Sequence, residues 1–315
     1  MNRPIDVVTF GEAMVLIQPQ IAGPLAQATV LSRSIAGAES NVAIGLSRLG
    51  RRARWISRVG SDPFGQVVIN TMAAEGVDIS MVERDPDAPT GIFFRDFRSG
   101  AEPVGYYYRR QSAFSKLSPR DVKAEWFADA RHLHVTGVTP PLGENTTEAV
   151  IVAMKRAREM GLTISFDPNL RRKLWDDATA RRTLLDLVPL CDVLLPGREE
   201  AEFLVGTGSD EELSRKLLSL GAGAVVMKLG GDGAMAMVGR QIIRSPGWKV
   251  ERVIDPIGAG DAFAAGFLSV YIDVAGPLTQ EQWRTALDRA NRMGSAATQF
   301  QGDWEGLPRL PDLQP

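Results

Sequence analysis

Short apolar runs alternate with segments of helical period through most of the chain. Runs of strand length lie at 5–11, 52–60, 132–137, 162–169, 192–196 and 224–230, and helical patterns lie between them at 40–50, 64–77, 145–161 and 211–221. Strands that alternate with helices in this way are typical of a parallel sheet covered on both faces. We therefore predict an α/β fold, a three-layer α/β/α sandwich with a mostly parallel central sheet.

Two segments, 12–36 and 89–110, break this alternation. The second contains two aromatic and arginine-rich runs around a Gly/Pro turn, "GIFFRDFRSGAEPVGYYYRR", which favours an antiparallel hairpin. With the extended run at 13–19 it is expected to form a small β-sheet lid that keeps water from a reaction. We predict a single domain over 1–315 that carries this lid.

The bulk composition indicates a small-molecule partner. The formal net charge is −2 and the basic residues are scattered, so we expect neither a nucleic-acid partner nor a membrane partner. The start of the chain lacks the long apolar region of a signal peptide, and we expect a cytoplasmic protein. Cys191 is interpreted as a small buried apolar residue. His132 and His134 alternate on one strand, which explains them better than a zinc site does.

The stretch "DPIGAGDAFAAG", 255–266, is the strongest candidate for chemistry. It follows an expected strand at 250–255 and opens an alanine-rich helix. Glycines around Ala259 allow backbone N–H groups to converge on an anion at a helix N-terminus, and Asp261 lies in the first turn. Asp261 is either a helix-capping carboxylate or a base that takes a proton beside a phosphate. A P-loop is excluded because the chain has no Gly-Lys dipeptide.

Several strings together resemble the signature regions of the ribokinase-like (PfkB) carbohydrate kinases. These are "DPIGAGDAFAAG", the earlier "GAESNVAIGLSRLG" and "RVGSDPFG", and the C-terminal "RANRMGSAATQFQGDWEGLP". They occur in the order and spacing of that family, and the resemblance runs nearly end to end. It implies a ribokinase-like fold, Asp261 as the general base, and an anion hole for the transferred phosphoryl group formed by Gly258, Ala259 and Gly260.

The resemblance also implies a sugar site. The matching region of these kinases holds sugar hydroxyls through the Gly37 backbone and the Asn41 side chain. The alternative interpretation is that Ser40 or Asn41 caps the helix that follows. The pattern of Tyr107 and Arg109 on the hairpin, with Arg171 after a strand, is similar to the family's kinases for 2-keto-3-deoxygluconate. Two guanidinium groups suit a carboxylate ligand better than a neutral hexose. The alternative interpretation is that these arginines and Tyr107 are solvent-exposed surface residues.

One position departs from the pattern of those keto-acid kinases. Phe93 stands where they often have tyrosine, so a hydroxyl donor is lost while the ring still packs against the sugar. A lost hydrogen bond to a neutral partner is worth about 0.5–1.5 kcal/mol. We expect this loss to alter the preference between epimers but not the assignment.

ATP and Mg²⁺ are the small molecules that the resemblance adds. The implied nucleotide-binding residues are Lys228, Gly230, Gly233, Gly258, Gly260 and Asn291. Glu200 is implied to hold Mg²⁺ through water, although Gly197 replaces the family's usual asparagine. A tight hairpin turn is the alternative explanation for the glycines.

The function expected from these motifs is ATP-dependent phosphorylation of the 6-hydroxyl of 2-keto-3-deoxygluconate. A fructokinase or another neutral-sugar kinase of the family is the first alternative. A sugar- or nucleotide-binding regulatory protein without activity is the second. By analogy with the family, we also expect a homo-oligomer that forms through the lid.

Overall fold

The computed structural model describes residues 5–21, 23–97, 103–274 and 276–313. Its main sheet has eight strands in the order β14-β13-β12-β11-β10-β9-β1-β4. Neighbours from β12 to β4 pair in parallel, and β13 and β14 add an antiparallel edge. The strands are β1 (Ile5–Phe10), β4 (Ala53–Ile56), β9 (Ala130–Thr136), β10 (Thr163–Asp167), β11 (Val193–Leu194), β12 (Ala224–Lys228), β13 (Ala234–Val238) and β14 (Gln241–Ser245).

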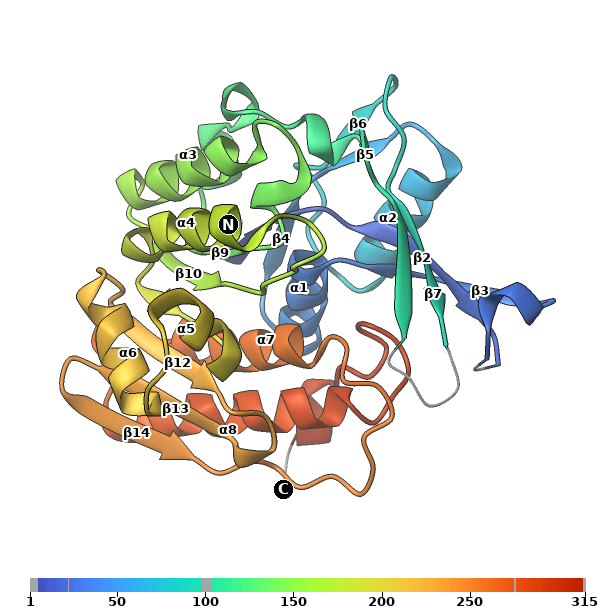
Figure 1. The fold of residues 1–315 in the computed structure, drawn as a ribbon. Helices are drawn as coiled ribbons and strands as arrows, with labels where there is room; N and C mark the ends of the chain where they lie inside the picture. Colours follow the sequence, from blue (N-terminus) through green and yellow to red (C-terminus); the bar gives the residue numbers. More distant parts are fainter. Residues whose placement is uncertain (1–4, 22, 98–102, 275, 314–315) are drawn as a thin grey trace.

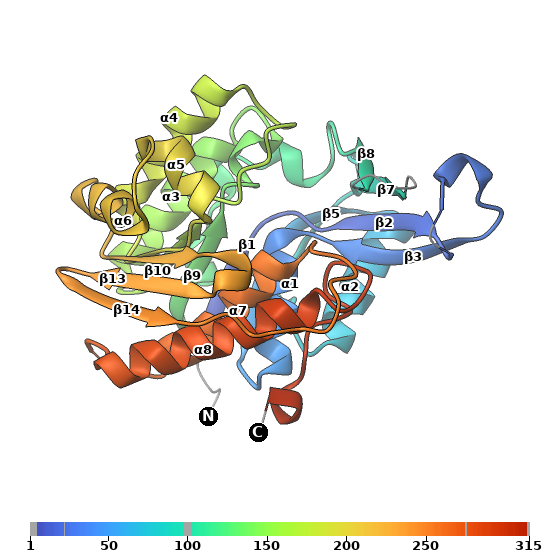
Figure 2. The same cartoon turned by 60° about the horizontal axis from the view of Figure 1, so that its bottom comes forward.

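Helices cover both faces of this sheet, as Figures 1 and 2 show. One face carries α3 (Thr146–Glu159), α4 (Asp177–Leu187), α5 (Arg198–Val205) and α6 (Asp210–Ser219). The other carries α1 (Ala38–Arg48), α2 (Pro63–Ala74), α7 (Ala259–Tyr271) and α8 (Gln280–Ala297). Short 3-10 helices lie in the connections, η1 (Leu25–Gln27), η2 (Phe114–Lys116), η3 (Pro119–Asp121), η4 (Ala124–Trp126), η5 (Pro140–Leu142), η6 (Val188–Leu190), η7 (Gly230–Asp232) and η8 (Leu310–Leu313). The predicted three-layer architecture is confirmed.

The strands of the main sheet are continuous apolar runs because their side chains are buried on both faces of the sheet. Val7 and Val8 are adjacent and fully buried, yet Val7 packs with α1 and α7 in one core and Val8 packs in the other. Successive side chains of a strand point to opposite faces, so a sheet between two helix layers requires apolar residues at every position.

A second sheet of four strands, called the small sheet below, extends from one side of the main sheet (Figure 2). Its order is β3-β2-β7-β8, from β3 (Leu31–Ala36), β2 (Met14–Pro19), β7 (Ile92–Asp96) and β8 (Val104–Tyr108). β7 and β8 form the predicted antiparallel hairpin, with Phe93 opposite Tyr107. Most of its predicted Gly/Pro turn, 98–102, lies outside the described residues.

Two strand predictions are corrected. The run 250–255 is not a strand: the amides of Ile254 and Asp255 donate to the Thr298 carbonyl, and Val253 is 56% exposed. Its β-branched residues bridge to the end of α8 instead of pairing with a strand. The run 52–60 divides at Ser57 into β4 and a separate strand, β5 (Arg58–Gly60), which pairs with β6 (Glu83–Asp85).

Three side chains interpreted as structural are buried. Cys191 lies in the core against α3 to α6, and His132 and His134 lie on β9 with ring nitrogens 2.7 and 2.8 Å from the Ser165 hydroxyl. The described residues contain no group of three or more His, Cys, Asp or Glu side chains able to hold a metal ion. No helix within the described ranges is long and apolar enough to cross a membrane.

Candidate active site

A cleft of about 1130 Å³ lies where the C-terminal ends of β10 and β12 meet the small sheet and the start of α7. Ligands of open α/β sheets bind at this end of the strands. The sequence-predicted residues that line it are Gly37, Asn41, Phe93, Tyr107, Arg109, Arg171, Glu200, Lys228, Gly230, Gly258 and Asp261. Residues separated by more than 200 positions therefore meet in one cleft.

The start of α7 presents unpaired backbone donors. Gly258 is the N-cap with φ +78°, and a Cβ there would lie 2.0 Å from the Asp303 carbonyl oxygen. The amide of Ala259 donates to Pro256, whereas those of Gly258, Gly260 and Asp261 have no acceptor in the part of the chain that the structure describes. These amides and the helix dipole make the position suitable for an anion.

Asp261 is buried in the first turn of α7, at 5% exposure. One carboxylate oxygen accepts from Asn41 Nδ2 at 2.8 Å and the other from Asn169 Nδ2 at 3.2 Å. Burial raises the pKa of Asp261 to about 7, and the Asn41 hydrogen bond and the charge of Arg171 lower it only in part. Because neither oxygen caps a backbone amide, the capping interpretation fails, and a carboxylate with this pKa accepts a proton near neutral pH.

The start of α1 places Asn41 beside Asp261. Gly37 is the N-cap, with no side-chain capping bond, and Ser40 Oγ donates to the Gly37 carbonyl at 2.8 Å. Neither Ser40 nor Asn41 caps this helix, so that alternative is wrong. Glu39 anchors the turn by accepting from the Thr136 and Thr139 hydroxyls, both at 2.8 Å.

Asn169 was missed by the sequence analysis. It follows β10 with φ +35°, a conformation that asparagine tolerates better than most residues, and this backbone turns its amide toward Asp261. A polar residue just past the carboxyl end of a parallel strand, within the string "DPN", was the available signal. Its contact partner lies 92 positions away and was not visible.

Arg109 is held by a carboxylate that the sequence analysis also missed. Its Nε donates to Glu12 Oε2 at 2.7 Å, and Glu12 is itself 4% exposed and accepts from Ser112. Nearby, the rings of Phe93 and Tyr107 stack at 5.2 Å between centroids. Arg109 therefore presents the remaining edge of its guanidinium to the cleft, and its charge is largely offset by Glu12.

Arg171 differs from Arg109 because its guanidinium has no carboxylate partner within the described ranges. The side chain is exposed on the wall of the cleft and makes no hydrogen bond or ion pair in that part of the chain. A free guanidinium at the mouth of a cleft suits a carboxylate ligand.

The predicted nucleotide residues separate into two groups. Lys228 and Gly230 line the cleft, and Lys228 Nζ contacts both Asp167 oxygens at 2.7 and 2.8 Å. Gly258 lines the cleft too, whereas Gly233, Gly260 and Asn291 are not among the described residues that line it. A Cβ at Gly233 would lie 2.2 Å from the Ser245 carbonyl, and Asn291 Nδ2 donates to Ser245 and Pro246.

Glu200 has oxygens that fit an indirect magnesium ligand. One accepts the Leu170 amide at 2.8 Å and the other accepts the Gly197 amide at 2.6 Å. Each carboxylate oxygen keeps a lone pair after one such bond. The described residues offer no cluster of carboxylates for a dedicated cage, which agrees with an ion that keeps its waters and binds phosphate.

This chain is similar to known proteins over nearly its whole length. A 2-dehydro-3-deoxygluconokinase from Bacillus subtilis is 40% identical over 98% of this chain and 94% of its own length. One from Thermoproteus tenax is 35% identical over 96% and 91%. The structure of a putative ribokinase II from E. coli in complex with ATP and Mg²⁺ superposes with a TM-score of 0.87 at 28% identity, over 98% of this chain and 97% of that one.

The family model covers almost the whole chain. Residues 4–310 match the model described as pfkB family carbohydrate kinase. That range includes every element of the cleft, from the small sheet to the segment after α8. The chain therefore belongs to the pfkB family of carbohydrate kinases.

Proposed function

We propose that this chain transfers a phosphoryl group from ATP to the 6-hydroxyl of 2-dehydro-3-deoxygluconate, the compound also called 2-keto-3-deoxygluconate. The observation that carries the proposal is the buried Asp261, whose pKa is raised to about 7 and which lies beside unpaired amides in a cleft with a free Arg171. The 2-dehydro-3-deoxygluconokinases among the relatives support the substrate.

Asp261 is the proposed base. It takes the proton of the 6-hydroxyl as that oxygen bonds to the γ-phosphorus, and the bond from this phosphorus to the bridging oxygen of ADP breaks. The amides of Gly258 and Gly260 stabilise the charge on the transferred group, with Ala259 fixing the turn between them. Mg²⁺, when bound, offsets charge on the phosphates, and Glu200 would hold one of its waters. Asn169 and Asn41 keep the carboxylate of Asp261 in place.

The acid end of the substrate is assigned to the arginines. Arg171 supplies the net charge that attracts the carboxylate, and Arg109, held by Glu12, supplies a fixed donor edge. Phe93 and Tyr107 form an aromatic wall, with the Tyr107 hydroxyl as a further donor. Gly37 offers its backbone to a sugar hydroxyl.

The nucleotide is assigned to the other end of the cleft. Lys228 and Gly230, which line the cleft, are the residues proposed to contact the phosphates and the nucleoside. Gly233 and Asn291 act indirectly, because they fix the hairpin between β12 and β13 and the loop after β14 on which the nucleotide rests.

A coupled assay of ADP release tests the substrate. We expect kcat/KM for 2-dehydro-3-deoxygluconate to exceed that for fructose or ribose by at least about tenfold, the factor of 1.4 kcal/mol that one good contact supplies. Faster turnover of fructose would contradict the substrate and favour a fructokinase. No turnover of any sugar in a single-turnover experiment would favour the regulatory alternative.

We further propose that the small sheet acts as the lid of one kinase domain spanning 1–315. Its residues Phe93, Arg95, Tyr107 and Arg109 line the cleft, which supports a covering role. We also propose a homo-oligomer formed through the outer face of this sheet, where Tyr108 is 68% and Leu31 is 44% exposed, and a cytoplasmic location, where ATP is available. Light scattering tests the assembly: replacing Leu31 by Asp should yield monomers, and an unchanged mass would contradict it.

A further inference from the structure

A buried arginine joins the small sheet to the loop that precedes α7. Arg95 lies on β7 and is only 2% exposed. Its Nη1 donates to Asp255 Oδ2 at 3.2 Å, its Nη2 donates to Asp303 Oδ1, and its guanidinium carbon lies 5.8 Å from the centre of the Phe93 ring. One guanidinium therefore spans two acidic side chains that belong to different segments of the chain.

Both acidic residues control the shape of the turn at Gly258. Asp255 Oδ1 accepts the Ile257 amide at 3.0 Å and its Oδ2 accepts the Gly302 amide at 3.2 Å. The backbone of Asp303 packs directly against Gly258, where a Cβ would lie 2.0 Å from the Asp303 carbonyl. The loop that presents the unpaired amides is thus fixed from one side by Asp255 and from the other by Asp303.

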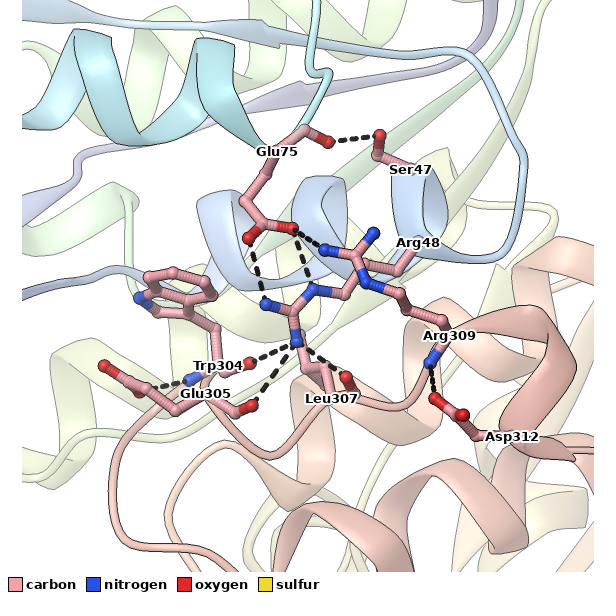
Figure 3. A network of polar contacts seen from close by, with 8 residues as sticks. All are labelled: Ser47, Arg48, Glu75, Trp304, Glu305, Leu307, Arg309 and Asp312. Carbon is pink, nitrogen blue, oxygen red and sulfur yellow. Dashed lines mark hydrogen bonds and ion pairs between the residues drawn. The ribbon is translucent and has the colours of Figure 1, made fainter.

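The segment that follows Asp303 is anchored independently to the helical layer (Figure 3). Arg48 donates through Nη1 to the carbonyls of Trp304 and Leu307 at 3.2 and 2.6 Å. The other edge of this guanidinium binds Glu75 at 2.8 and 3.0 Å, and Trp304 Nε1 donates to the Ile35 carbonyl at 3.1 Å. Asp303 therefore begins a segment whose anchoring contacts do not depend on Arg95.

We propose that Arg95 is a positioning residue for phosphoryl transfer, which locks the small sheet to the anion-binding turn of α7. The inference rests on the proposed function, because the turn matters only if it receives a phosphoryl group. Arg95 acts on the reaction indirectly, through its contacts with Asp255 and Asp303. These contacts fix the position of the sugar-facing residues of the small sheet relative to the amides of Gly258 and Gly260.

The chemistry of the group explains why it is an arginine. A guanidinium donates from two nitrogens in a fixed plane and spans two carboxylates, whereas an ammonium acts as one point charge. Without the cation, the buried Asp255 and the largely buried Asp303 would be two uncompensated carboxylates beside the site for an anionic phosphoryl group. Loss of Arg95 should therefore both loosen the turn and repel the phosphate.

The test compares Arg95→Met and Arg95→Lys with Arg240→Met. Arg240 is an exposed arginine in the turn between β13 and β14 and does not line the cleft, so it is the control for loss of an arginine outside the site. We expect kcat of Arg95→Met to fall by about 100-fold, the cost of a misplacement near 1 Å, while KM for the sugar rises less than about tenfold. Arg95→Lys should recover part of kcat, and the control should match wild type.

Hydrogen exchange supplies a readout that does not depend on turnover. In the Arg95 variants, the amides of Ile257 and Gly302 should exchange at least about tenfold faster, while those of β1 and β10 remain protected. A kcat within threefold of wild type, or a loss confined to KM, would overturn the proposal. So would faster exchange throughout the molecule, because that would show general destabilisation.

This design separates the two proposals. If wild type prefers fructose, the substrate proposal fails, and the Arg95 variants are measured with fructose under the same criteria. If wild type phosphorylates no sugar, exchange at Ile257 and Gly302 still decides whether Arg95 fixes the turn. Unchanged exchange at both amides would then refute the positioning role.

Discussion

Replacing Asp261 by Asn should abolish most activity and change the pH dependence of stability. Burial raises the pKa of Asp261 from 3.8 to about 7. Ionisation of this carboxyl therefore costs more free energy in the folded state than in the unfolded state. A difference of about three pH units corresponds to about 4 kcal/mol. Above pH 7 the full amount destabilises wild type. Below pH 3.8 none of it does.

The asparagine variant escapes this ionisation cost but loses a hydrogen bond. Its single carbonyl oxygen can accept from Asn41 or from Asn169, and its NH₂ then faces the other donor, at a cost of about 1–3 kcal/mol. The free energy of unfolding of the variant, relative to wild type, should therefore rise by about 2–3 kcal/mol between pH 5 and pH 7.5.

Urea unfolding at several pH values measures this difference, and steady-state kinetics measures the catalytic loss. We expect kcat to fall by about 10²- to 10⁴-fold, and wild-type kcat/KM to rise with pH up to about 7. Asp62→Asn is the control, and its stability relative to wild type should change with pH in the opposite direction. Burial of Asp62 works against ionisation, but the amides of Thr90 and Gly65 outweigh burial and hold the pKa of Asp62 below its usual value. Undiminished turnover, or a stability difference that is flat with pH, would refute the reasoning.

Four further substitutions each test a single contact. Gly258→Ala should lower kcat at least about tenfold. It should also reduce the free energy of unfolding by more than the roughly 1–2 kcal/mol that a left-handed conformation costs a non-glycine residue. Gly50→Ala is the control, because Gly50 has the same φ of +78° but open space around it. Arg171→Ala should raise KM for the keto acid at least about tenfold and KM for fructose less than threefold. Arg109→Ala should raise KM for the keto acid as well, and it should also lower the melting temperature because it leaves the buried Glu12 without its cation. Arg48→Met should cost about 1–3 kcal/mol in urea unfolding, because the Trp304 and Leu307 carbonyls lose their donor and Glu75 keeps only its contact with the exposed Arg309. A loss under about 0.5 kcal/mol would contradict this expectation.

The central sheet was predictable from the sequence because its energetics are local to each strand. A strand between two helix layers must be apolar on both sides, as at Val7 and Val8, and that leaves a clear pattern. The run 250–255 carries similar β-branched residues, but its amides at Ile254 and Asp255 donate to the Thr298 carbonyl at the end of α8 and not to a strand, so the same pattern predicted a strand that does not form. Pairing depends on distant segments and is not encoded in a single run.

The site was only partly predictable for the same reason. Glycines before Asp261 indicated an anion-binding turn because backbone geometry depends on the residues themselves. The partners that hold the charged groups of the site by hydrogen bonds, Glu12 for Arg109 and Asn169 for Asp261, lie 97 and 92 positions away. Asn291 shows the converse, since its place in a matching string did not reveal that Ser245 and Pro246 already occupy its amide.

The pairing of charges around the cleft explains how a base and several cations coexist. An unpaired cation close to Asp261 would favour its ionised form, lower its pKa and weaken it as a base. Lys228 instead binds Asp167. Burial lowers the pKa of its ammonium, but Asp167, with smaller contributions from Glu200 and Asp261, outweighs burial and raises that pKa. Arg109 and Arg95 are likewise paired with carboxylates. Arg171 remains unpaired within the described residues, and a substrate carboxylate that binds it would remove its pull on Asp261. Binding of the acid end would then raise the basicity of Asp261 at the moment when the hydroxyl is in place.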